Sequence, residues 1–192
     1  TAGSEAIVAF CAGLADDTLA MVVLPRLDRA GQNSAWFEAL QADFPHAAVA
    51  GCSTAGNITR GGVCDARVSV TAVRFATRKP RIAAVPFHVD SGSQVAGETL
   101  ARALGDCAFD DVVVFAQGVG VNGSALIAGL QAVLGGQVRI SGGLAGDSRA
   151  FLRTLVMTDQ GPSDRHLVAI GFERSHMRVS HGSRGGWHPF GP

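Results

Sequence analysis

The chain has 192 residues (19.7 kDa), with 47% hydrophobic and 17% charged side chains, which suits one globular domain with a sizeable core and excludes intrinsic disorder. Its 25 glycines and the absence of Tyr are typical of a loop-rich α/β protein. Sixteen Lys and Arg balance sixteen Asp and Glu, so no broad positive surface is predicted. We therefore expect neither nucleic acid nor a membrane as a partner.

The sequence lacks the motifs of several common phosphate-binding, metal-binding and redox sites. Lys79 is the only lysine and no GxxxxGK string surrounds it, which excludes a P-loop. The cysteines form no CxxC pair, so neither a zinc ribbon nor a thioredoxin-type redox pair is predicted. The sequence shows no basic-then-apolar leader and no apolar run of about 18 residues. The cysteine pattern favours reduced, intracellular thiols.

The first part of the chain predicts a βαβ unit. A helix is expected over Ser4–Leu14. The short apolar runs Ala20–Leu24 and Ala47–Gly51 indicate strands buried on both faces. Between them, Asn33–Phe44 has the apolar stripe of an amphipathic helix. We expect the two strands to be parallel, with a right-handed crossover.

Alternating patterns in Arg67–Phe75 and Arg81–Val89, on either side of a turn at Lys79–Pro80, predict an antiparallel hairpin. A second βαβ unit follows it. Its expected elements are a preceding helix over Ser93–Leu104, a strand over Asp111–Gln117, a helix over Ser124–Leu134 and a strand over Gln137–Ser141.

The last third of the chain returns to short predicted strands. They are expected over Leu152–Thr158, His166–Phe172 and Met177–His181. The predicted fold class is therefore α/β, a single domain over residues 1–192 with a mixed, largely parallel β-sheet flanked by helices and with additional antiparallel strands.

Three Gly-rich strings follow predicted strands, where ligands usually bind in α/β sheets. They are GCSTAG (Gly51–Gly56), GVGVNG (Gly118–Gly123) and SGGLAGD (Ser141–Asp147). Glycine lets the backbone approach a ligand, and the polar residues between supply hydrogen-bond partners. Each string taken alone also fits a turn that only lets a helix pack on a strand. Together they predict a small polar pocket with these ligand-binding residues: Gly51, Cys52, Ser53, Thr54, Asn122, Gly123, Gly142, Gly143, Gly146 and Asp147.

Two enzyme-like patterns compete with this interpretation. GVGVNG matches the GxGxxG dinucleotide fingerprint, but the next strand ends in Ser141–Gly143 without the carboxylate that would hold a ribose. GCSTAG approaches the GxSxG nucleophile elbow with one residue too many after Ser53. The alternative is a hydrolase or transferase that uses Cys52 or Ser53 as nucleophile. Cys52 also fits a small packing residue, which would argue against this alternative. We expect a binding module, not an enzyme.

Histidines cluster towards the end of the chain, together with arginines. They suit ligation of a metal or a haem iron, and they equally suit an exposed, Arg-rich segment. Odd spacing on the predicted strand places His176 and His181 on opposite faces. We take His181 as the first candidate haem ligand and His188 as the second, because Pro189 restricts its backbone.

The order of several strings resembles the N-terminal domain of FIST proteins, the F-box and intracellular signal transduction sensory proteins. The resemblance covers nearly the whole chain. The strings are VAGCSTAGNI (Val49–Ile58), SVTAVRF (Ser69–Phe75), VNGSALIAGL (Val121–Leu130), ISGGLAGD (Ile140–Asp147) and GGWHPFGP (Gly185–Pro192).

The resemblance implies a cytoplasmic sensory module that binds a small molecule and reports to a histidine kinase or a cyclic-dinucleotide enzyme. Amino-acid-like metabolites are the implied ligands, and one branch of the family is similar to haem-binding sensors of nitric oxide. Family members continue past the GW...FGP string into a C-terminal FIST domain, which this chain lacks. A pocket wall is then either missing or supplied by another subunit, as in a homodimer.

Overall fold

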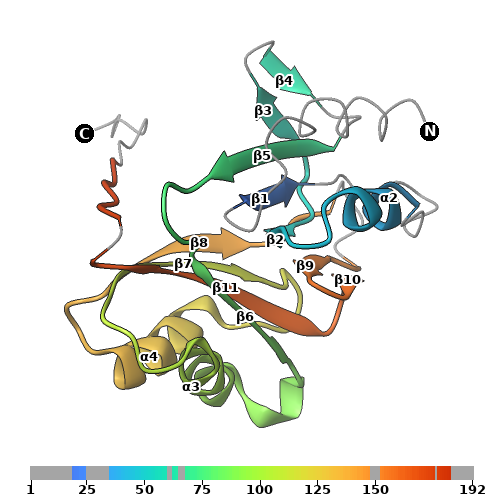
Figure 1. Cartoon of the computed structure of the whole chain (residues 1–192). Helices are drawn as coiled ribbons and strands as arrows, with labels where there is room; N and C mark the ends of the chain where they lie inside the picture. The colour runs from blue at the N-terminus through green and yellow to red at the C-terminus, as the bar shows by residue number, and fades with distance from the viewer. Residues whose placement is uncertain are drawn as a thin grey trace, which may run out of the picture.

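The computed structural model describes residues 19–24, 35–59, 62–64, 68–147, 152–175 and 177–182. Its elements carry the labels of Figure 1. They are β1 (Leu19–Leu24), α2 (Ala35–Asp43), β2 (Ala48–Cys52), β3 (Asn57–Thr59), β4 (Gly62–Cys64), β5 (Ser69–Arg74), β6 (Arg81–Pro86), the 3₁₀ helix η2 (Val89–Ser91), α3 (Ser93–Leu104), β7 (Phe109–Ala116), α4 (Gly123–Leu134), β8 (Arg139–Leu144), β9 (Val156–Thr158), β10 (Gly161–Ser163) and β11 (His166–Glu173).

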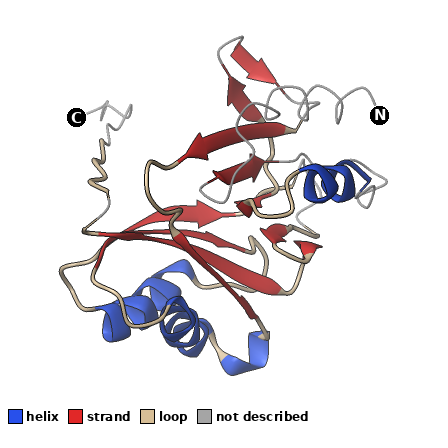
Figure 2. Cartoon of the chain, in the orientation of Figure 1, coloured by secondary structure: helices blue, strands red, loops and turns tan. Residues whose placement is uncertain are grey.

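Two sheets form the centre of the fold. One has the strand order β10-β9-β2-β1-β5, the other β6-β11-β7-β8, and β3 and β4 pair separately. Helices α3 and α4 cover the four-stranded sheet on one side, while α2 lies beside the five-stranded sheet (Figure 2). Because one apolar cluster also joins the two sheets, the described elements stack as helix, sheet, sheet and helices.

The alternation of side chains along each strand explains this stacking. In β2, Val49 packs with Phe37 and Leu40 of α2, whereas Ala50 belongs to the cluster between the sheets. In β7, Val112, Val114 and Ala116 pack in the cluster with α3 and α4. The alternate residues of β7, Val113 and Phe115, face the other sheet. Both strands are apolar on both faces because both are covered on both faces.

The two predicted βαβ units are confirmed. Strands β1 and β2 are parallel, with Ala20 opposite Ala48, and β7 and β8 are parallel, with Asp111 opposite Arg139. Helix α3 spans Ser93–Leu104 as expected. The α/β class with mixed sheets is therefore confirmed. None of the helices in the described ranges is long and apolar enough to cross a membrane.

The expected predominance of parallel pairing is not found. Apart from β1–β2 and β7–β8, the described strand pairs are antiparallel, and the strands form two main sheets instead of one. The reason is that strands from the last third enter both sheets: β9 pairs with β2, and β11 lies between β6 and β7. Side-chain periodicity identifies a strand but not its partner.

The predicted hairpin of residues 67–75 and 81–89 is wrong. Strand β5 pairs with β1 and β6 pairs with β11, so the intervening residues carry the chain from one sheet to the other. Alternation is the same for a strand that pairs with its neighbour in sequence and for one that pairs with a distant strand.

The predicted strand over residues 177–181 is also wrong, because this segment has no regular secondary structure. Instead of strand pairing, polar contacts of Val179 and His181 fix the position of this segment. The predicted helix over residues 4–14 lies outside the described residues.

The close crossing of α3 and α4 generates the first prediction. A Cβ atom at Gly97 would overlap the carbonyl oxygen of Leu126 in α4. Gly97→Ala should therefore lower the free energy of unfolding by about 1–3 kcal/mol, as measured by urea denaturation. Gly136→Ala is the control, since a Cβ atom at Gly136 meets nothing within 4 Å. Equal stability of the two variants would contradict the crossing.

Candidate functional site

The three Gly-rich strings lie together at the carboxyl ends of β2, β7 and β8. The Ala145 N–H donates to the Ala116 carbonyl (2.7 Å), and the Gly146 N–H donates to the Ser53 carbonyl (2.9 Å). A Cβ atom at Gly118 would overlap the Ala145 carbonyl oxygen. The strings GCSTAG, GVGVNG and SGGLAGD therefore form one edge, which we call the three-loop edge.

Ser53 holds two of these loops together. Its side chain is fully buried, and its hydroxyl donates to the Gly146 carbonyl (2.8 Å) and accepts from the Leu155 N–H (2.9 Å). The Ser53 N–H donates to the Leu155 carbonyl (2.8 Å). The Ser53 hydroxyl donates its proton to a backbone carbonyl and not to a base. This arrangement favours a structural role for Ser53, which connects two loops.

Cys52 lies in the apolar cluster between the sheets, with Ala145 and Val156 among its members. Burial raises the pKa of the Cys52 thiol to about 11. At neutral pH the group is thus the thiol and not the nucleophilic thiolate. These surroundings favour the packing role over the nucleophilic one.

The glycines of the third string differ in their surroundings. Gly142 has a φ of 133°, and a Cβ atom there would overlap the backbone of Val114. A Cβ atom at Gly146 would approach Ala55 N at 3.0 Å, whereas at Gly143 it would meet nothing within 4 Å. Gly142 therefore allows close contact with the backbone of Val114, and Gly146 allows close contact with Ala55. Gly143 faces open space.

The remaining predicted residues mainly order the loops. Asn122 caps α4, because its Oδ1 accepts from the Ala125 N–H (3.0 Å). Asp147 Oδ2 accepts from the Leu152 N–H (2.9 Å). The Thr54 hydroxyl donates to Asn57 Oδ1 (3.1 Å).

The predicted glycines at the other two loops lie at element ends. Gly51 pairs with Met157 within the five-stranded sheet, and Gly123 opens α4 with nothing within 4 Å of an added Cβ.

Gln117 is a polar residue at this edge that the sequence prediction did not include. It follows the last residue of β7, and only 8% of its surface is exposed. Among the residues that the structure describes, none offers a hydrogen-bond acceptor to its Nε2. A buried donor left in this state costs about 1–3 kcal/mol. The sequence signal was a polar residue that ends the apolar run DVVVFA before the Gly-rich string.

Exposed apolar side chains accompany Gln117. Val119 and Leu144, which belong to two of the three strings, are each nearly half exposed, and Leu152, whose N–H donates to Asp147, is largely exposed. The three-loop edge thus combines a buried amide donor, a carboxylate at Asp147 and apolar surface, which is the mixture found in small-molecule sites.

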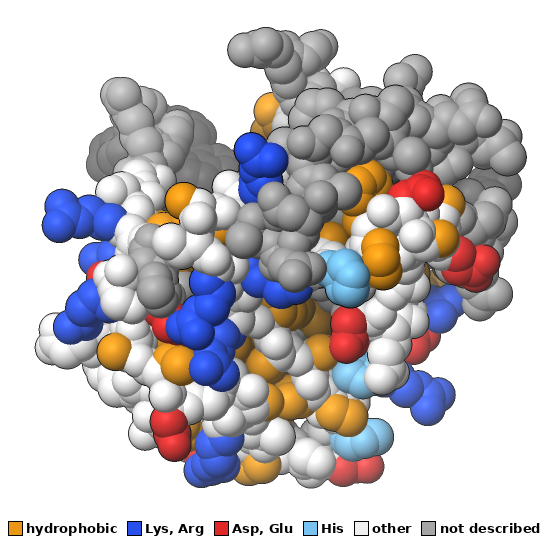
Figure 3. Space-filling view, in the orientation of Figure 1, with side chains coloured by type: hydrophobic (Ala, Val, Ile, Leu, Met, Phe, Trp, Pro, Cys, Tyr) orange, Lys and Arg blue, Asp and Glu red, His pale blue; other side chains and the backbone are white. Residues whose placement is uncertain are grey.

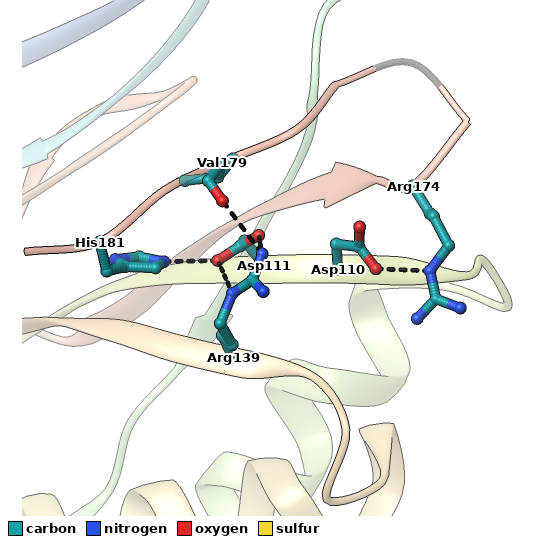
Figure 4. Close-up of polar contacts among 6 residues, drawn as sticks. All are labelled: Asp110, Asp111, Arg139, Arg174, Val179 and His181. Carbon is teal, nitrogen blue, oxygen red and sulfur yellow. Dashed lines mark hydrogen bonds and ion pairs between the residues drawn. The ribbon is translucent and has the colours of Figure 1, made fainter.

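His181 lies at the opposite end of the four-stranded sheet, against the buried Asp111 carboxylate (Figure 4). Its Nε2 pairs with Asp111 Oδ1, and Arg139 donates to both oxygens of that carboxylate, from Nε to Oδ1 (3.0 Å) and from Nη2 to Oδ2 (2.6 Å). Arg139 Nη2 also donates to the Val179 carbonyl (3.0 Å). Asp111 therefore anchors the segment 177–182 to the start of β7.

The structure does not bring His181 to the three-loop edge, since Asp111 and Ala116 lie near opposite ends of β7. His176 and His188 lie outside the described residues. Within the described ranges, no three side chains of the metal-ligating types gather.

The Asp111 cluster predicts a pH dependence. Hydrogen bonds from Arg139, above all, and from His181 lower the pKa of Asp111, although burial opposes them. A lowered pKa in the folded state means that the charged form stabilises the fold above the unfolded-state pKa of about 4, and that this contribution disappears as the pH falls through the folded-state value.

Asp111→Asn should therefore lower the free energy of unfolding by about 2 kcal/mol at pH 7, and the difference from wild type should shrink as the pH falls below about 4. Urea denaturation of both proteins at a series of pH values from about 2.5 to 7, a range that spans the unfolded-state pKa of Asp, measures this difference. A difference that stays constant with pH would show that the Asp111 charge contributes nothing.

The family of the chain follows from its sequence. The FIST N domain matches residues 18–192. No curated protein matches the chain. No solved structure matches it either. Since the family match covers nearly the whole chain and includes all three loops, the protein belongs to the FIST family, whose domains serve sensory signal transduction.

Proposed function

We propose that this FIST domain is a sensory module that binds an amino-acid-like metabolite at the three-loop edge. The observation that carries the proposal is the buried Gln117 amide, whose Nε2 has no acceptor among the described residues, at the place where three loops meet. A ligand that supplies an oxygen to this donor would remove the cost of leaving it unpaired.

The chemistry of the edge supports this class of ligand. The Gln117 amide suits a carboxylate or carbonyl oxygen, and the Asp147 carboxylate in the third loop suits an ammonium group. Exposed apolar side chains nearby, such as Val119 and Leu144, suit an aliphatic side chain of the ligand.

A binding role is better supported than catalysis. The Ser53 hydroxyl donates to a backbone carbonyl, and burial raises the pKa of Cys52. The alternative of a hydrolase or transferase would require one of these groups to be deprotonated by a base, and none contacts either group in the described chain.

The signalling step in this proposal takes place in the cytoplasm. Occupancy of the edge would be reported to a histidine kinase or to a cyclic-dinucleotide enzyme. A C-terminal FIST domain or a second copy of this chain would complete the wall of the pocket.

Gly143→Val tests the location of the ligand. Its side chain would enter the open space above β8 without a clash, so the variant should fold with wild-type stability and lose binding by at least about tenfold. Isothermal titration calorimetry with each of the common L-amino acids measures the ligand affinity. Gly136→Val is the control, because it adds the same side chain in open space before β8.

Gln117→Met separates ligand recognition from folding. Loss of an unpaired buried amide should leave stability unchanged or raised, while ligand affinity falls. If no amino acid binds the wild-type chain, the proposed ligand class is wrong. If one binds and neither variant weakens it, the site is elsewhere.

A second candidate is haem, as in a nitric-oxide sensor, and the pairing of Asp111 with His181 favours it. A carboxylate that holds one imidazole nitrogen fixes the ring and makes the other nitrogen a better metal ligand. With Nε2 on Asp111, His181 would offer Nδ1 to the iron. The bound iron would supply the site for nitric oxide. His188 is the alternative ligand.

Haemin titration tests this candidate. We expect one-to-one binding with a sharp Soret band that nitric oxide shifts after reduction, and that His181→Ala or His188→Ala abolishes. His166→Ala is the control, since His166 contacts Ser163 in a different part of the fold. A broad band that does not saturate, or one unaffected by every histidine variant, would exclude haem.

A further inference from the structure

A small groove lies where the connection between β5 and β6 meets the end of β11. Its volume is about 120 Å³. Half-buried Phe75, Phe172 and Met177 supply its apolar surface. The other lining residues are Ala76, Thr77, Arg78, Lys79, Pro80 and Glu173.

Positive charge surrounds this groove although the whole chain is neutral. The segments 74–81 and 173–178 carry six cations, and in the ion pairs of the described residues their acidic partners are Glu173 and Asp110. Figure 3 shows Lys and Arg side chains gathered over the β5–β6 connection and the end of β11, with few acidic side chains between them. The cations are Arg74, Arg78, Lys79, Arg81, Arg174 and Arg178.

Ion pairs order part of this positive surface without neutralising it. Glu173 accepts from Arg78 Nη2 (2.6 Å) and from Arg81 Nε (3.3 Å). One carboxylate thus orients two guanidinium groups and leaves a net positive charge. Although burial opposes it, these two hydrogen bonds together lower the pKa of Glu173, so the arrangement persists at mildly acidic pH.

We propose that this groove docks an acidic segment of a partner protein, with one aliphatic side chain of the segment in the groove and its carboxylates on the surrounding arginines. Arginine suits carboxylates because its planar guanidinium can donate two parallel hydrogen bonds. The groove is smaller than the roughly 300–1,000 Å³ of sites for small molecules. Its size therefore suits a single anchoring side chain.

The position of the groove keeps it apart from the three-loop edge. Glu173 lies opposite Phe109, the first residue of β7, whereas the loops follow the last residue, Ala116. At a rise of about 3.3 Å per residue, β7 separates the two regions by roughly 20 Å. A partner can thus bind the groove while a ligand occupies the edge, and this inference does not depend on the ligand.

Selection from a random dodecapeptide library on the immobilised chain tests the proposal. We expect enriched peptides to combine several Asp or Glu with one Leu, Ile or Met. Fluorescence anisotropy of the best peptide should show one-to-one binding that weakens as salt increases, because exposed charges are screened.

Two variants leave the ion pairs of Glu173 intact, and each should weaken binding at least about tenfold. Arg178→Glu reverses an exposed charge beside the groove, and Ala76→Trp fills the groove itself. Arg165→Glu is the control, since it reverses an exposed charge just before the start of β11, at the other end of that strand from the groove. The acidic peptide with every Asp and Glu replaced by amides should not bind.

Enrichment without an acidic bias, or equal binding by the wild type and both variants, would overturn the proposal. Charge-dependent binding to phosphatidylserine vesicles without selection of any acidic peptide would also overturn it and would assign the surface to a membrane. Circular dichroism and thermal melting of each variant ensure that a loss of binding does not arise from unfolding.

Discussion

The hydrogen bonds of Ala145, Gly146 and Ser53 connect the two sheets at one edge, and the candidate site depends on them. The peptide groups of Ala145 and Gly146 bond to the end of β7 and to the loop after β2, respectively. Ser53 adds Leu155, the residue before β9, to the same junction. Each group is buried in or next to an apolar cluster, where an unpaired backbone group would be costly.

This constraint gives the fold two ends that are built differently. At one end, small residues and backbone contacts bring three loops together around Gln117. At the other, Asp111 and Glu173 orient arginines and the segment 177–182 through ion pairs. Strands β7 and β11, which are buried along most of their length, run between the two ends.

The sequence predicted the local elements better than their pairing. The βαβ units could be predicted because apolar runs, an amphipathic helix and chain order determine them. The partners of β5, β6 and β11 could not be predicted, since a half-buried strand has the same alternation beside any neighbour. The edge formed by the loops followed from their positions after strands. Gln117 could not be recognised, because its lack of a partner depends on burial by residues distant in sequence.

Hydrogen exchange read by NMR tests the central claim that ligand binding and the three-loop edge coincide. The backbone amides of Ser53, Gly118 and Gly146, together with the Gln117 side-chain amide, report on the junction directly. When an amino acid that binds the chain is added, these groups should show slower exchange and the largest shift changes, while Glu173 and Arg178 stay unchanged. Binding that perturbs the region around Glu173, or any region except the three loops, would contradict the account.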